Sequence, residues 1–349
     1  MTDNRYRRLP VGIQSFKVIR EENYLYVDKS DIVWNMVNLG DKYNYLSRPR
    51  RFGKSVLVDT LESYLEGRKD LFEGLKIMQL EKDWKHYPVI RLDMSRGGAS
   101  EETLRSYLNL RFKDYEEKYN ITPDPTAMLA DRFHAIIVTA YKQTGLRVAV
   151  LIDEYDSPLQ HSWRTPEHEK CTGVYREVFA ILKADDEYEH FVFITGITKF
   201  TQISIFSVLN NLSNISFMPE YAAICGITEE EIEENFMPEI RQMSEANNWS
   251  VQETHDRLKA YYDGYHFSDD NMVDIYNPYS LVNALKQRKI KNFWASSGAT
   301  SLLPKFVDNA ELRLSNFENC SIMRNTLELS DVSGGRCYPG YREEPGSCC

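Results

Sequence analysis

Residues 48–55 carry the clearest sign of phosphate chemistry in this chain, reading Arg-Pro-Arg-Arg-Phe-Gly-Lys-Ser. A glycine lets the backbone turn so that successive N–H groups point inward and cradle phosphate oxygens. We expect Lys54 to reach the terminal phosphates of a nucleotide and the Ser55 hydroxyl to ligate Mg²⁺. The predicted nucleotide-binding residues are Arg48, Arg50, Arg51, Phe52, Gly53, Lys54, Ser55 and Val56.

This segment departs from the usual Walker A pattern at its first position. The pattern has glycine where the chain has Arg48. Arginine resists a positive φ, so we expect the loop to start differently. The arginines of the segment would add charge beside a triphosphate and partly offset the missing glycine. Taken alone, Gly53-Lys54-Ser55 is equally compatible with an ordinary helix start.

A second segment supports the interpretation of residues 48–55 as a phosphate-binding loop. The apolar run 148–152 ends in two carboxylates, Asp153 and Glu154. Ligands of an open α/β sheet gather at the carboxyl ends of its strands. We expect Asp153 to hold Mg²⁺ through water and Glu154 to polarise the attacking water. Solvated acids at a strand end are common for either acid alone, but the pair together with the glycine–lysine–serine segment favours a catalytic role.

A third apolar segment, residues 191–199, ends in polar residues. In P-loop ATPases with an additional central strand, a polar residue at this place contacts the terminal phosphate or the water. Thr195 or Thr198 is suited to that contact, and Lys199 adds charge. The signal is weak alone because strands often end in Thr-Gly for reasons of turn geometry. The predicted catalytic set is Glu154, Thr198 and Lys199, and the predicted metal ligands are Ser55 and Asp153.

These residues need a scaffold of alternating strands and helices. Short apolar runs predict strands at residues 43–47, 89–93, 147–153 and 191–195. Helical spacing is clearest at residues 55–66, 101–119, 127–141 and 167–184. The alternation predicts βαβ units and a parallel sheet covered on both faces. We therefore expect a three-layer α/β P-loop NTPase domain over residues 1–226.

After about residue 226 the sequence pattern changes from alternating strands and helices to mainly helices. Thr228 and Glu231 have capping-box spacing at the start of an acidic helix, and further helices are expected at 251–262 and 278–289. An aromatic segment with turn signals, residues 262–267, lies between these two helices. We expect a smaller, mainly helical, winged-helix-like domain over residues 227–330. Residues 331–349 lack any apolar periodicity and are expected to be a disordered tail.

The amino-acid composition of the chain bears on which classes of partner it can bind and where it is located. The chain has 349 residues and a net charge of −10, from 52 acidic and 42 basic residues, which does not support a surface built for nucleic acid. The six cysteines lack zinc-site spacing and fit a reducing, cytoplasmic setting. We find neither a signal peptide nor an apolar stretch that could span a membrane.

Together these segments resemble the AAA-ATPase-like family, which is widespread in anaerobic bacteria, from about residue 9 to about residue 330. The matching stretches are residues 9–16, 24–29, 48–55, 151–156, 195–200, 262–265, 276–278 and 292–294. The family pattern itself has arginine at the position of Arg48. The resemblance implies ATP and Mg²⁺ as ligands, Walker A at residues 53–55 and Walker B at Asp153 and Glu154. Longer members carry a PD-(D/E)XK nuclease-like domain, for which the chain leaves no room after residue 330.

We therefore expect Mg²⁺-dependent ATP binding with slow hydrolysis that depends on a partner, either another protein or a second copy of the chain. One alternative is a nucleotide-gated interaction module that never turns ATP over. The other is a regulatory part of a nuclease system that acts on nucleic acid.

Overall fold

Five parallel strands form a sheet at the centre of the part of the chain that the computed structural model describes, which is residues 8–124, 126–197, 211–268 and 273–293. The strands are β1 (Tyr43–Ser47), β2 (Val89–Asp93), β3 (Val148–Asp153), β4 (Glu189–Gly196) and β5 (Ser213–Asn214). Their order is β2-β3-β4-β1-β5. The predicted α/β class and parallel sheet are confirmed.

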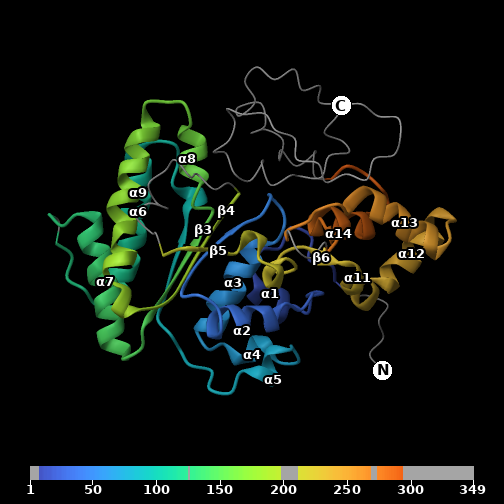
Figure 1. Cartoon of the computed structure of the whole chain (residues 1–349), viewed down its shortest axis with the longest axis horizontal. Helices are drawn as coiled ribbons and strands as arrows, with labels where there is room; N and C mark the ends of the chain where they lie inside the picture. Colours follow the sequence, from blue (N-terminus) through green and yellow to red (C-terminus); the bar gives the residue numbers. More distant parts are fainter. Residues whose placement is uncertain (1–7, 125, 198–210, 269–272, 294–349) are drawn as a thin grey trace.

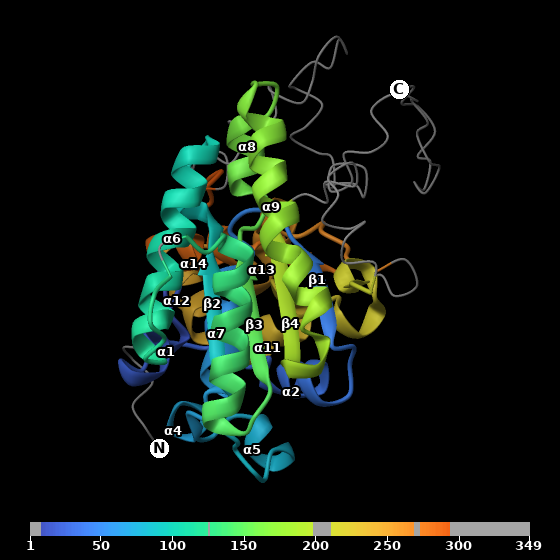
Figure 2. The ribbon, with the colours of Figure 1, turned by 90° about the vertical axis from the view of Figure 1, so that its left-hand side faces the viewer.

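Helices cover both faces of the sheet (Figure 1). One face carries α6 (Glu101–Lys118), α7 (Leu129–Thr144) and α9 (Glu167–Ala184), while the short α8 (Ser157–Ser162) precedes α9. Figure 2 looks onto α6, α7 and α9 with the strands behind them. The other face carries α1 (Phe16–Glu21), α2 (Ser30–Asn38) and α3 (Lys54–Leu65), together with the short α4 (Lys69–Phe72) and α5 (Ile77–Leu80). These three layers explain why β3 is buried at every position.

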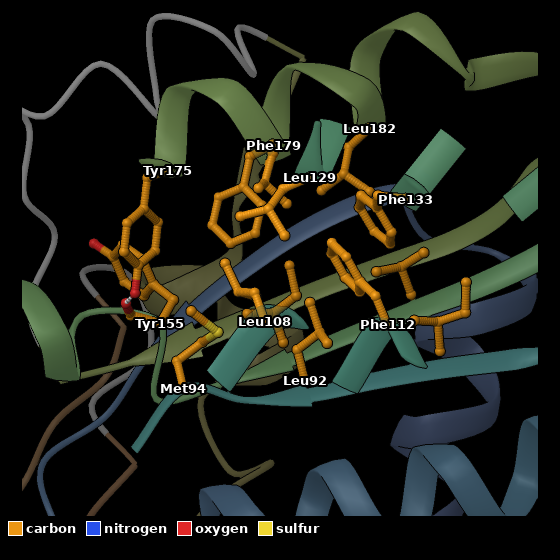
Figure 3. Close-up of a cluster of buried hydrophobic side chains, with 14 of the residues drawn as sticks. Leu92, Met94, Leu108, Phe112, Leu129, Phe133, Tyr155, Tyr175, Phe179 and Leu182 are labelled. Carbon is orange, nitrogen blue, oxygen red and sulfur yellow. Dashed lines mark hydrogen bonds between the residues drawn. The ribbon is translucent and has the colours of Figure 1, made fainter. Parts of the chain in front are cut away.

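The core under α6, α7 and α9 is aliphatic and aromatic (Figure 3). Phe112 and Phe133 stack there with ring centroids 5.3 Å apart, and both rings are fully buried. Burying a phenylalanine side chain stabilises a fold by about 1.5–3 kcal/mol. At the end of this core nearest the phosphate loop, the Tyr175 hydroxyl donates to the carbonyl of Tyr155. This contact ties α9 to the chain directly after Glu154.

A mainly helical region follows the sheet. It contains α11 (Glu229–Asn235), α12 (Met237–Asn247), α13 (Val251–Tyr262) and α14 (Pro278–Gln287), with β6 (Ile227–Thr228) antiparallel to β7 (Ile275–Tyr276). The capping box of Thr228 and Glu231 is present at the start of α11. The helices share their own core, in which Ile232, Phe236 and Leu281 are buried. The described part of the predicted second region, residues 227–268 and 273–293, is mainly helical as expected, whereas residues 294–330 lie outside the described residues and the winged-helix-like character stays a prediction.

The domain boundary at residue 226 stays a prediction, and the expected tail, residues 331–349, lies outside the described residues. Ile224 and Cys225 belong to the core beneath the sheet, whereas Ile227 packs with the helices. Leu9, Val11, Leu25 and Val27 also pack against the helical core. The N-terminal segment therefore lies between the sheet layer and the helices. None of the helices in the described ranges is long and apolar enough to cross a bilayer.

Candidate nucleotide site

The loop between β1 and α3 has the geometry of a tight phosphate loop. Gly53 has a φ of +88° and Arg51 a φ of +67°, so both adopt the left-handed region. A Cβ on Gly53 would meet nothing within 4 Å, so glycine is needed there for its conformation rather than for space. The loop thus turns at two points directly before α3 begins at Lys54.

Lys54 lies over this loop. Its Nζ donates to the carbonyls of Arg48 at 2.9 Å and Pro49 at 3.0 Å. Burial lowers the pKa of the Lys54 ammonium, and the nearby carboxylates, Asp153 foremost, oppose that shift. Two backbone carbonyls of the loop therefore hold the ammonium in place.

The acidic pair at the end of β3, Asp153 and Glu154, faces the start of α3. Asp153 and Ser55 line the same small hollow. Burial raises the pKa of the Asp153 carboxyl, and Ser55 and Lys54 oppose that shift. Burial also raises the pKa of Glu154, again opposed by Lys54. Glu154 has a φ of +47°, which is rare for a residue other than glycine or asparagine. The structure thus brings together Lys54, Ser55, Asp153 and Glu154, as the sequence predicts.

The Ser55 hydroxyl and the Asp153 carboxylate have the chemistry of Mg²⁺ ligands. In the described ranges, no group of three or more His, Cys, Asp or Glu side chains is arranged to hold a metal. Mg²⁺ commonly takes only one or two carboxylates and completes its shell with water and nucleotide phosphates. The donors present therefore fit a magnesium ion that arrives with a nucleotide.

β4 lies in the sheet between β1, which leads into the phosphate loop, and β3, which ends at the acidic pair. Its Thr195 is buried, and the hydroxyl donates to the carbonyl of Leu46 at 2.8 Å. Thr195 therefore serves the sheet, and Thr198 and Lys199 lie outside the described residues. Asp156, two residues after Glu154, is buried and accepts from the N–H of Ile197 at 2.9 Å. It fixes the exit of β4, a role that the local sequence does not signal.

A cavity of about 490 Å³ opens beside the loop. Most of its walls come from four parts of the chain: the loop and first turn of α3, the N-terminal segment, the turn before β6, and α14. The lining includes residues 50–57, residues 10–14, residues 25–27, residues 224–227, and Tyr279, Val282 and Asn283. A smaller hollow of about 190 Å³ adjoins Ser55 and Asp153. Tyr279 and Asn283 were not predicted, although the Tyr-Asn-Pro turn at 276–278 could have pointed to them.

Arg48 is placed differently from the other predicted loop residues. It is fully buried, and its guanidinium donates to the carbonyls of Ser47 at 2.9 Å, Ser216 at 2.6 Å and Tyr221 at 2.9 Å. Burial lowers the pKa of Arg48 to about 10. Arg50, Arg51, Phe52 and Val56 line the large cavity, and Arg48 is outside its lining. The side chain of Arg48 therefore braces the protein instead of facing the phosphates, because backbone carbonyls surround its charge.

The sequence matches a family described as predicted AAA-ATPase over residues 10–206. A protein of Azotobacter chroococcum mcd 1, described as an uncharacterized protein in the vnfD 5′ region, is 33% identical over 302 residues. That alignment covers 85% of this chain and 55% of the relative, so the chain spans about half the length of that protein.

Among solved structures, the Aeropyrum pernix ORC2 protein in its ADPNP–ADP complexes matches with a TM-score of 0.38 and 12% identity. The match covers 91% of this chain and 74% of ORC2. A TM-score of this size is too low to establish a shared fold. The family match, by contrast, spans both the phosphate loop and the acidic pair, and it supports nucleotide binding.

Proposed function

Because this chain belongs to the family of predicted AAA-ATPases, we propose that it binds ATP with Mg²⁺ and hydrolyses it slowly unless a partner stimulates it. One observation carries the proposal: Ser55 and Asp153 line the same hollow, and Lys54, Ser55 and Glu154 line the adjoining cavity of about 490 Å³. Such a site joins a phosphate loop, a pair of Mg²⁺ ligands and room for a nucleoside.

At the phosphate end, Lys54 would exchange its two carbonyl partners for phosphate oxygens. Ser55 would ligate Mg²⁺ directly and Asp153 through water. Mg²⁺ supplies charge neutralisation at the phosphates. Glu154 lines both hollows, so it can orient a water molecule toward the terminal phosphate.

The nucleoside would occupy the part of the cavity away from α3. Residues 10–14 and 25–27 form one wall, and Tyr279, Val282 and Asn283 of α14 form the other. The Asn283 amide donates to the Tyr279 carbonyl at 2.8 Å, which leaves its oxygen side to face a base or ribose donor. This wall is where a preference between ATP and GTP would arise.

Slow turnover follows from how the loop arginines are held. Arg48 is surrounded by carbonyls, and the Arg51 guanidinium lies over the Tyr279 ring at 4.1 Å. An arginine that a partner supplies in trans can accelerate phosphoryl transfer about 10³–10⁵-fold. A protein partner or a second copy of the chain is therefore part of the proposal, as is a cytoplasmic location.

Calorimetry with ATP and GTP, each with and without Mg²⁺, tests this proposal. We expect Mg²⁺-dependent binding by the parent protein. Lys54→Ala should weaken ATP binding about ten- to over a hundredfold, because charge-assisted hydrogen bonds contribute roughly 1.5–3 kcal/mol. The control is Lys113→Ala, which removes an exposed lysine of α6 that pairs with Glu117. Parental affinity in Lys54→Ala would remove the phosphate-loop assignment.

An ATPase assay separates the proposal from a nucleotide-gated module without turnover. Any hydrolysis that Lys54→Ala abolishes favours the enzyme. Binding without hydrolysis under every condition, including high protein concentration that favours self-association, favours the module.

A further inference from the structure

The aromatic segment 262–267 and the adjoining α14 contact the phosphate loop directly. Phe52 of the loop is buried, and its ring packs edge-on against Tyr265, with centroids 4.7 Å apart and planes at 70°. It packs in the same way against Phe267, at 5.5 Å and 89°. Such edge-to-face pairs contribute beyond the burial of their surface. The middle of the loop therefore rests on two rings of the helical region.

Arg51 is held from the same side. Its φ of +67° is a conformation that costs a residue other than glycine about 1–3 kcal/mol and persists only where the surroundings over-determine it. The ring of Tyr279, at the start of α14, lies 4.1 Å from the centre of the guanidinium. The neighbouring Phe52 is fixed as described above. The strained turn of the loop is thus stabilised by contacts from outside the loop.

A third contact reaches Lys54. The Arg48 guanidinium lies 4.1 Å from the centroid of the Phe267 ring and donates to the carbonyls of Ser216 and Tyr221. The carbonyl of Arg48 in turn accepts from Lys54 Nζ at 2.9 Å. Phe267 therefore helps to fix the residue that positions the lysine ammonium.

We propose that Tyr265, Phe267 and Tyr279 form an aromatic brace that sets the conformation of the phosphate loop, so that ATP affinity depends on the docking of the helical region against it. The inference rests on the proposed ATP binding and adds a means of regulation. Tyr265 and Phe267 lie outside the cavity lining and are positioning residues, which act through Phe52 and Arg48. Tyr279 acts through Arg51 and also lines the cavity. A partner that moves the helical region away from the loop would weaken phosphate binding without touching the nucleotide.

Calorimetry on ring-removal variants tests the brace. Phe267→Leu should weaken ATP binding about tenfold, in line with the loss of one aromatic contact and one cation–π contact. The matched control is Phe112→Leu, which removes an equally buried ring from the stacked pair on the opposite face of the sheet. It should lower the melting temperature by a similar amount and leave ATP affinity unchanged.

A milder pair of variants keeps the test valid if Phe267→Leu unfolds. Tyr265 is only partly buried, so Tyr265→Leu should remain folded and lose affinity, while Tyr265→Phe keeps the ring and should retain parental affinity. Inorganic triphosphate, used as a competitor, should lose affinity by the same factor as ATP, because the brace acts on the phosphates.

The outcomes separate the two proposals. If the parent binds ATP and the folded ring-removal variants bind it equally well, the brace is wrong and the proposed function stands. Loss of affinity in Phe112→Leu comparable to that in Phe267→Leu also overturns the brace. If the parent binds neither ATP nor triphosphate, the proposed function fails, and the brace fails with it.

Discussion

The two carboxylates at the end of β3, Asp153 and Glu154, are adjacent in sequence and differ in their surroundings. Asp153 is almost fully buried and lines the small hollow together with Ser55. Glu154 is partly exposed, and its left-handed backbone turns its side chain toward both hollows. The difference in surroundings favours a metal-binding role for the first and a water-orienting role for the second.

Exchange of Glu154 for glutamine should therefore separate binding from turnover. Glu154→Gln keeps the shape of the side chain and loses the charge that orients water. We expect ATP affinity within about twofold of the parent and a rate of phosphate release lower by about 10²–10⁴-fold. Glu117→Gln, an exposed change on α6, serves as the control. A parental rate of phosphate release in Glu154→Gln would refute the role assigned to Glu154.

Another buried carboxyl, Glu189, should make stability depend on pH. Burial raises its pKa from 4.5 to about 8, opposed by the hydroxyl of Tyr43, which donates to its Oε2 at 2.7 Å, and by Lys42. Asp185 and Asp186 raise the pKa further. Because the folded pKa is raised, the stabilising effect of the proton is complete below about pH 4.5 and is lost as pH rises through about 8.

The free energy of unfolding of the parent should therefore fall relative to that of Glu189→Gln across this window, by up to about 1.4 kcal/mol per pH unit. Urea unfolding of both proteins at pH 5.5, 7 and 8.5 measures the difference. A difference that is constant with pH would show that Glu189 does not titrate in this range.

At the scale of elements, the sequence predicted most of the strands and helices. The strands at 43–47 and 89–93 and the helix at 167–184 have the predicted bounds, because apolar runs and helical spacing are local signals. The six-residue α1 (Phe16–Glu21) is too short to show such spacing, and it was not predicted. The burial of Arg48 could not be predicted either. Its carbonyl partners at Ser216 and Tyr221 are distant in sequence, and carbonyls leave no sequence pattern.

The turn into β6 offers a test at this scale. Gly226 has a φ of +97°, and a Cβ there would lie 2.2 Å from Cγ2 of Ile275 in β7. Gly145, at the end of α7, has a φ of +69° and nothing within 4 Å of a Cβ. Both positions disfavour alanine by about 1 kcal/mol for backbone reasons. Gly226→Ala should cost a further 1–3 kcal/mol or so for the clash.

Urea unfolding of Gly226→Ala and Gly145→Ala measures the two costs. Because Gly226 lines the cavity, only Gly226→Ala should also weaken ATP binding. Equal losses of stability in the two variants would mean that β7 moves away from the added methyl group without destabilising the protein.

At the scale of the whole molecule, one ion pair joins the N-terminal segment to the helical region. Lys29 Nζ donates to both carboxylate oxygens of Glu231, 202 residues later in the chain. Both side chains are mostly buried, and Lys29 lines the large cavity. Glu231 also closes the capping box of α11 through its bond to the N–H of Thr228.

Removal of one partner alone should be costly. Lys29→Met leaves the Glu231 carboxylate unpaired and should destabilise the protein by about 3–5 kcal/mol. Adding Glu231→Gln keeps the capping oxygen and removes the stranded charge, so the double variant should recover most of that loss. Thermal and urea unfolding of the parent and the three variants complete the cycle. A double variant no more stable than Lys29→Met would show that packing, not charge, accounts for the loss.

The parallel pairing of β1 with β4 also has a consequence for biosynthesis. Leu46 and Thr195 are joined by a hydrogen bond across 149 positions of sequence. At typical elongation rates, roughly 7–30 seconds pass between their synthesis. During that time β1 exposes aromatic side chains along an unpaired edge that can associate with other chains. The N–H of Arg48 also needs the carbonyl of Gly196 as acceptor. β1 and the start of the phosphate loop can therefore form these hydrogen bonds only after β4 has left the ribosome.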